Sequence, residues 1–134
     1  MEIVNRKSKF EFEFLDSYTA GIVLTGIEVK FIRDSKLSFS DSYCQFQNGE
    51  LFLKNVSISG IGNDNIKRDR KLLLNKKELN KIQKALISNI TIVPYKIFTN
   101  NKGLFKVEIK IAKGKKLYDK RETLKKRDLE REIH

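Results

Sequence analysis

The sequence predicts a mainly β fold with flanking helices, in which six short strands close into a small barrel that is followed by a disordered basic tail. Three observations predict this fold. Apolar and polar residues alternate over several short runs, which is the period of a half-buried strand. Two helix-start signals stand among those runs. Residues 118–134 are mostly charged, so we expect a barrel domain over residues 1–117 and a flexible tail over residues 118–134.

The first 33 residues predict two strands and a helix. Phe and Glu alternate strictly over residues 10–14, which predicts a strand with three aromatic rings on one face. Residues 20–24 predict a second strand after the polar pair Asp16 and Ser17. Thr25, with Glu28 three residues later, is typical of a capping box and predicts a short helix over residues 27–33.

The middle of the chain predicts a hairpin, a loop and a second helix. A third strand ends near Phe46, and Asn48-Gly49 is a strong hairpin signal that leads into a fourth strand over residues 51–53. Residues 59–66 are the clearest loop. Asn75, with Glu78 three residues later, predicts the start of the second helix.

The last two strands are predicted over residues 90–98 and 105–111, on either side of a turn over residues 99–103. Pro94 has no N–H to donate, so it indicates a sheet edge or a bulge. Six short strands, with one helix early and one between the fourth and fifth strands, are typical of a closed barrel of the oligonucleotide-binding type.

The charge is distributed unevenly along the chain, and the net value is +11. Residues 1–66 carry 7 Lys and Arg against 9 Asp and Glu, or −2, whereas residues 67–134 carry 21 against 8, or +13. This asymmetry predicts one basic face and a polyanionic partner. The alternative is a general enrichment in solvated cations, but a diffuse enrichment would not leave the first half net acidic.

Two local clusters concentrate the cations. They are Lys67, Arg68, Arg70 and Lys71 between the loop and the second helix, and Lys113, Gly114, Lys115 and Lys116 after the last strand. Such cations would bind phosphates and release counterions, although a solvated loop is the alternative in both places. Tyr18, Tyr43 and Tyr95 are able to stack on bases, but aromatic residues in strands belong to the core more often.

Catalysis and metal binding are poorly supported. The single histidine is His134, the last residue, where a general base would be neither buried nor oriented. Cys44 is expected to pack in the core, and no Cys/His pair has ligand spacing, so we expect no metal and no cofactor. With no membrane-length apolar run, no secretory signal and a single cysteine, we expect a cytoplasmic protein. We also expect it to be a monomer and not an enzyme.

The tail is too polar to fold alone. Residues 118–134 hold six basic and five acidic side chains, with only Tyr118, Leu124, Leu129 and Ile133 apolar. Four scattered apolar residues do not offset the conformational entropy that ordering would cost. We therefore expect the tail to become ordered on a partner.

Several blocks, in order along the chain, resemble one known family. They are Asn-Arg-Lys at 5–7, Ala-Gly-Ile-Val-Leu-Thr-Gly-Ile-Glu-Val-Lys at 20–30, Asp-Ser-Tyr at 41–43, Arg-Lys-Leu-Leu-Leu at 70–74, Gly-Lys-Lys-Leu-Tyr-Asp-Lys-Arg at 114–121 and Lys-Arg-Asp at 126–128. Each block alone would be weak, but their order and separations are specific. From about residue 5 to the C-terminus, the chain resembles the bacterial SsrA-binding protein (small protein B) family.

This resemblance implies a barrel that binds the tRNA-like domain of transfer-messenger RNA and brings this alanine-charged RNA to stalled ribosomes for trans-translation. It implies a binding partner rather than a catalyst. The tail would enter the vacant mRNA channel and the decoding centre, where it would become helical against rRNA.

The resemblance also implies particular contact residues. Glu28 and the block 114–116 would belong to the RNA-contact surface. Because a carboxylate repels phosphate, Glu28 would accept a hydrogen bond from a base or a 2′-hydroxyl, or would orient Lys30 or Arg33. The tail residues expected at the ribosome are Tyr118, Asp119, Lys120, Arg121, Lys125, Lys126 and Arg127.

The chain departs from the family in two places, and two other functions stay open. Residues 59–69 lack the His and the Asp-Pro pair that the family usually has there, and the tail is shorter than in many relatives. Another basic barrel module of translation, such as a ribosomal protein or an initiation factor, would bind rRNA without preferring transfer-messenger RNA. An RNA-processing enzyme with carboxylates and Mg²⁺ would show metal-dependent turnover.

Replacing Asp119, Lys120 and Arg121 together with Ala is expected to leave binding of free transfer-messenger RNA nearly intact and to abolish tagging on stalled ribosomes. The barrel has its own apolar strands and cationic clusters, whereas the tail has to order on something else. A reconstituted tagging assay measures the effect, with filter binding of the RNA as the control. Full tagging by the triple variant would contradict the role given to the tail.

Overall fold

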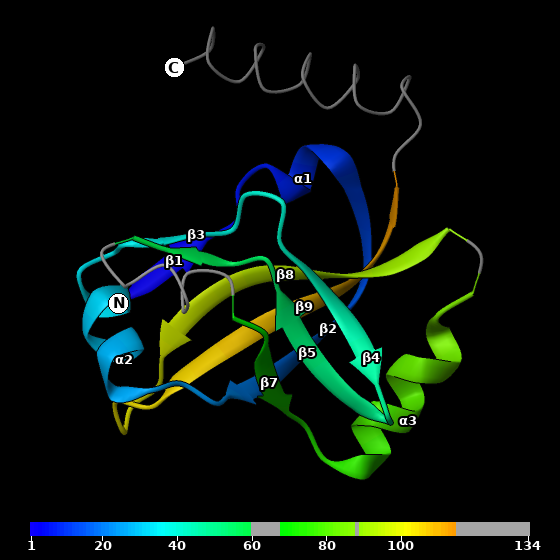
Figure 1. The fold of residues 1–134 in the computed structure, drawn as a ribbon. Helices are drawn as coiled ribbons and strands as arrows, with labels where there is room; N and C mark the ends of the chain where they lie inside the picture. The colour runs from blue at the N-terminus through cyan, green and yellow to red at the C-terminus, as the bar shows by residue number, and fades with distance from the viewer. Residues whose placement is uncertain (60–67, 88, 115–134) are drawn as a thin grey trace, which may run out of the picture.

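The computed structural model describes residues 1–59, 68–87 and 89–114. Its strands form a seven-stranded antiparallel sheet in the order β1-β8-β9-β2-β7-β5-β4 and a two-stranded sheet of β3 and β6 (Figure 1). The strands are β1 Glu2–Val4, β2 Phe12–Ile22, β3 Leu37–Ser38, β4 Tyr43–Gln47, β5 Glu50–Lys54, β6 Ser57–Ile58, β7 Arg70–Leu73, β8 Ile90–Thr99 and β9 Phe105–Gly114. The helices are α1 Ser8–Glu11, α2 Gly26–Arg33 and α3 Lys76–Ala85.

The three long strands β8, β9 and β2 form the centre of the large sheet. In β9, Phe105, Val107, Ile109 and Ile111 are buried, whereas the residues between them are half-buried and point to the other face. Register partners continue the pattern, because Val107 lies opposite both Ala20 of β2 and Ile97 of β8. The predicted alternation of the last strand is therefore confirmed, and one face of this strand packs into the core.

The first predicted strand is wrong at its start and too short at its end. Residues 8–11 form the one-turn helix α1, so Phe10 is helical, and the strand begins at Phe12. The two strands predicted on either side of Asp16 are one continuous strand, β2, in which the register shifts between Phe14 and Asp16. The extra residue of this bulge is Leu15, and the polar residues Asp16 and Ser17 stay in register with β9.

Both helix-start signals are confirmed. The Thr25 hydroxyl accepts from the Glu28 N–H at 3.3 Å, and the Glu28 carboxylate accepts from the Thr25 N–H at 2.8 Å. Asn75 and Glu78 make the same reciprocal pair at the start of α3, at 2.7 and 3.2 Å. Each box satisfies two N–H groups that a helix start leaves without partners.

The hairpin at Asn48-Gly49 is confirmed, and four strands were not predicted. Asn48 and Gly49 have φ values of 52° and 79°, and Gln47 lies opposite Glu50, as in a two-residue hairpin. The unpredicted strands are β1, β3, β6 and β7. β7 matters most, because it connects β2 to β5 and so joins the two halves of the sheet.

The prediction of a closed six-stranded barrel is wrong, because the described sheet ends at β1 and β4. The Pro94 carbonyl accepts from the Asn5 side chain at 2.9 Å, on the edge of β8 that faces away from β9. In a strand, the N–H and the carbonyl of one residue point to the same side. Because proline has no N–H, Pro94 offers no hydrogen-bond donor on this side of β8. The register of β8 also shifts between Pro94 and Lys96, which confirms the predicted bulge. Side chains of β4 and β8 instead line a shared hollow.

Three predictions concern residues outside the described ranges. These are the loop over residues 60–66, the tail over residues 118–134 and the division of the chain at residue 117. Lys113 and Gly114 are described, and they form the end of β9 rather than a segment after it.

Gly49→Ala is expected to lower the free energy of unfolding by about 1–2 kcal/mol, because an L side chain is strained at a φ of 79°. Denaturation by urea measures the loss. Gly26→Ala is the matched control, since a Cβ there would meet nothing within 4 Å and the residue opens α2. The control is expected to leave the stability unchanged or slightly raised. Equal losses in both variants would contradict the assignment of the hairpin turn.

Candidate nucleic-acid interface

Glu28, which the sequence analysis placed on the RNA-contact surface, lies inside the protein with a fully buried side chain. Its carboxylate accepts from Nη2 of Arg68 and, at 2.5 Å, from Nε of Arg70. The expected alternative partners, Lys30 and Arg33, are exposed on α2. The residues oriented by Glu28 are therefore the two arginines of the first cationic cluster.

Arg70 is as deeply buried as Glu28 and is held by several acceptors. Its Nη1 donates to the Arg68 carbonyl at 2.7 Å and to the Val56 carbonyl at 3.4 Å. Burial lowers the pKa of the Arg70 guanidinium, and the Glu28 carboxylate opposes this shift. Arg70 consequently binds Glu28 in the interior and presents no surface to a phosphate in this structure.

Burial by itself would raise the pKa of the Glu28 carboxyl. Hydrogen bonds from the Thr25 N–H and Arg68, together with the charge of Arg70, outweigh it and hold the pKa below its usual range. Glu28 is therefore ionised at neutral pH. It joins the start of α2 to the start of β7, two segments about 40 residues apart in the chain.

The remaining described cations of the first cluster lie at the surface, each beside a carboxylate. Arg68 is one-third exposed, and Lys71 donates to Glu50 at 2.9 Å on the neighbouring strand β5. Lys54, also on β5, pairs with Asp69 at 3.2 Å. Arg68 and Lys71 are thus the cluster members able to reach a phosphate. Lys67 lies outside the described residues.

The second cluster is described only at its beginning. Lys113 and Gly114 are exposed at the end of β9, opposite Glu13 and Phe12 of β2. Lys115 and Lys116 lie outside the described residues, as do the seven predicted ribosome-contact residues, Tyr118, Asp119, Lys120, Arg121, Lys125, Lys126 and Arg127.

The described parts of the two clusters do not form the single basic face that the charge asymmetry predicted. Gly114 lies opposite Phe12, the first residue of β2, whereas Leu72 lies opposite Ile22, the last residue. The clusters therefore flank opposite ends of β2, about 30 Å apart at the rise of a strand. Both clusters belong to the second half of the sequence, and nothing in the sequence indicates that they lie far apart in the fold.

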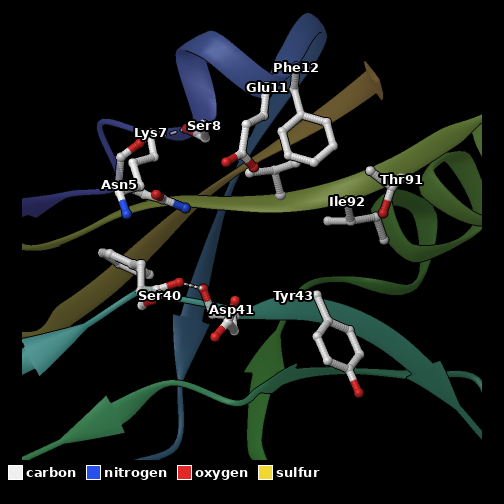
Figure 2. Close-up of a pocket in the computed structure, with 13 residues that line it drawn as sticks. Asn5, Lys7, Ser8, Glu11, Phe12, Ser40, Asp41, Tyr43, Thr91 and Ile92 are labelled. Carbon is white, nitrogen blue, oxygen red and sulfur yellow. Dashed lines mark hydrogen bonds between the residues drawn. The ribbon is translucent and has the colours of Figure 1, made fainter. Parts of the chain in front are cut away.

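A polar hollow of about 210 Å³ lies between α1, the segment joining β3 to β4, and β8 (Figure 2). It brings together Asn5 and Lys7 with Asp41 and Tyr43, which belong to two blocks of the family resemblance. Figure 2 shows Glu11 and Lys7 on one side and Asp41 and Tyr43 on the other. Asn5, Lys7 and Asp41 were not among the predicted contact residues, and Tyr43 was considered only as a ring able to stack on a base. The two family blocks were the signal that could have pointed to these residues.

The described residues offer no metal centre, and Cys44 is a packing residue. No group of three or more His, Cys, Asp or Glu side chains in residues 1–59, 68–87 and 89–114 is arranged to hold a metal ion. Burial raises the pKa of the Cys44 thiol, so it is not a thiolate at neutral pH. None of the helices in the described ranges is long and apolar enough to cross a membrane.

Fold and surface together define a class: a small antiparallel β-sheet domain with exposed cations at both ends of its central strand. Comparison with known proteins gives the family. The model of the SmpB protein family matches residues 2–134, and the chain belongs to this family.

Individual relatives and a solved structure agree with this assignment. The SsrA-binding protein of Phocaeicola vulgatus is 50% identical, over 99% of this chain and 93% of the relative. That of Thermosipho africanus is 47% identical, over 97% and 91%. A chain in the solved structure "tmRNA-SmpB: a journey to the center of the bacterial ribosome" is 36% identical, with a TM-score of 0.72 over 92% of this chain and 94% of that one.

Glu28→Gln is expected to lower the free energy of unfolding by about 3–5 kcal/mol near neutral pH, because two arginines lose their buried counter-charge. Since the folded-state pKa of Glu28 lies below its ordinary 4.5, its contribution is fully present above pH 4.5. It is lost as the pH falls through the folded-state pKa. Urea denaturation between pH 3 and pH 7 should therefore show the two proteins converging at low pH.

The matched control is Glu50→Gln, which removes the exposed partner of Lys71. It is expected to cost less than about 1 kcal/mol at every pH. A pH-independent loss in Glu28→Gln would show that the carboxylate charge is not what stabilises this site.

Proposed function

We propose that this protein binds transfer-messenger RNA through its β-sheet domain and delivers it to stalled ribosomes for trans-translation. The observation that carries the proposal is the match to the SmpB family over residues 2–134. Relatives named SsrA-binding protein, about half identical over nearly the full chain, support the RNA as the ligand. The solved tmRNA-SmpB chain supports the ribosome as the second partner.

The charge distribution suits a large folded RNA better than a small anion. Cations at opposite ends of β2 are separated by about 30 Å, which exceeds the span of a single phosphate group or nucleotide. A folded RNA presents phosphates over such a distance, and neutralising several of them releases counterions. Arg68 and Lys71 would contact one part of the RNA, and Lys113 to Lys116 would contact another.

The role of Glu28 in this function is to position Arg68. A carboxylate with no exposed surface does not meet the RNA directly, but it fixes the arginine that is one-third exposed beside it. Lys30 and Arg33, exposed on the same helix, are further candidates for phosphate contacts.

The finer parts of the proposal rest on the family resemblance. The tRNA-like domain is the part of the RNA bound, and the tail over residues 118–134 binds rRNA in the mRNA channel and the decoding centre. The protein acts as a monomer in the cytoplasm. It carries out no catalysis, because positioning the RNA is sufficient for this task.

The isolated protein is expected to bind the tRNA-like domain of transfer-messenger RNA more tightly than ordinary tRNA. Competition binding at fixed salt concentration measures the preference, and affinity for both RNAs should fall steeply as salt is raised. Equal affinity for the two RNAs would favour a general RNA-binding module of translation. Metal-dependent cleavage of either RNA would favour an enzyme.

A further inference from the structure

A cluster of two aromatic rings and two lysines lies on the face of the sheet opposite the core. Phe14 of β2 and Tyr95 of β8 meet edge to face, with ring centroids 5.4 Å apart and planes at 75°. Lys110 of β9, the strand between them, places its ammonium 5.6 Å from the Phe14 centroid and 5.0 Å from that of Tyr95. Lys9 of α1 lies 5.6 Å from the Tyr95 centroid. We call these four residues the aromatic–lysine cluster.

Two bulges build this cluster. The register of β2 shifts just after Phe14, and the register of β8 shifts at Tyr95, between Pro94 and Lys96. Pro94 lies opposite the core residue Ile109, whereas Lys96 lies opposite Glu108 on the outer face. The extra residue, Tyr95, is thereby turned toward the outer face, which is a common consequence of a bulge.

The cluster borders an open hollow of about 350 Å³, lined by Lys9, Phe12, Glu13, Phe14, Tyr95 and Lys110. Three of these residues are aromatic and two are lysines. Phe12 and Glu13 lie opposite Gly114 and Lys113, so the hollow adjoins the end of β9. The sequence continues from there into Lys115 and Lys116, the cations that were predicted to bind RNA.

We infer that this hollow binds one unstacked nucleobase of the RNA, with the base stacked on Tyr95 and Phe14 and the flanking phosphates bound by Lys9 and Lys110. The inference rests on the proposed function for the identity of the RNA. Aromatic rings accept the flat face of any base, and neighbouring cations follow the backbone.

Both ammonium groups lie close to the rings of the cluster. The Lys110 ammonium also lies 3.6 Å from the Glu108 carboxylate on the same strand, so it has a second interaction partner besides the rings. An exposed contact between an ammonium and a ring is weaker than stacking of a base on that ring. An arriving nucleotide is therefore able to displace the ammonium groups toward its phosphates.

The test measures binding of the full-length protein to the tRNA-like domain of transfer-messenger RNA. Tyr95→Leu and Phe14→Leu are each expected to weaken binding at least about fivefold, the lower end of the effect of losing a stacked base. Phe98→Leu is the matched control, because Phe98 is a half-buried ring of the same strand with Lys96 5.2 Å from its centroid. It is expected to change the affinity by less than about twofold, since Phe98 does not line the hollow.

Tyr95→Trp provides a readout that a purely structural role would not move. The chain has no tryptophan, so this variant carries a single indole reporter. Its fluorescence should be quenched by the tRNA-like domain, and its affinity should match that of the wild-type protein. RNA substituted with 5-bromouridine should also crosslink to the peptide that carries Tyr95 or Phe14.

The outcomes separate this inference from the proposed function. Wild-type affinity in both leucine variants, or unchanged indole fluorescence in the RNA complex, would overturn the nucleobase site while leaving RNA binding intact. Losses equal to that of Phe98→Leu would also overturn it. A wild-type protein with no preference for transfer-messenger RNA would instead overturn the proposed function.

Discussion

The buried charge of Glu28 is the constraint on which the arrangement of this domain depends. One carboxylate satisfies the start of α2, the side chain of Arg70 inside the sheet and the side chain of Arg68 at its surface. Arg70 extends the network to the Val56 carbonyl, so three segments distant in the sequence meet at one point. In the low dielectric of the interior, removing the carboxylate would leave the buried Arg70 cation without its counter-charge, which is far more costly than losing a surface ion pair.

The same network explains why a strongly basic sequence does not produce one basic face. Acidic residues from the first half of the chain lie against cations from the second half: Glu28 with Arg68 and Arg70, Glu50 with Lys71, and Glu2 with Lys96. The antiparallel sheet brings the two halves side by side and partly neutralises the difference between them. Several exposed cations away from these pairs lie on α2, on α3 and at the end of β9, and a folded RNA presents phosphates over such a spread. They include Lys30, Arg33, Lys76, Lys77, Lys81, Lys84 and Lys113.

The irregular parts of the sheet form the proposed nucleobase site, and its regular parts form the core. Regular alternation in β9 buries four apolar side chains against the core. The bulges in β2 and β8 place Phe14 and Tyr95 on the opposite face. The aromatic–lysine cluster therefore has its origin in the backbone irregularities of β2 and β8.

The sequence by itself determined the local features: two capping boxes, the Asn48-Gly49 hairpin, the bulge at Pro94, the alternation of the last strand and the family. The structural features among these are each encoded within a few neighbouring residues, where backbone geometry and side-chain hydrogen bonds decide the outcome, whereas the family follows from the order of several blocks along the chain. Only the tertiary structure decided that β7 is central, that residues 12–22 form one strand and that Glu28 is buried. These outcomes depend on partners about 40 to 100 residues away, such as Arg70 for Glu28 and β9 for β2. A one-dimensional pattern records which residues are polar, but it does not record which charges will face each other.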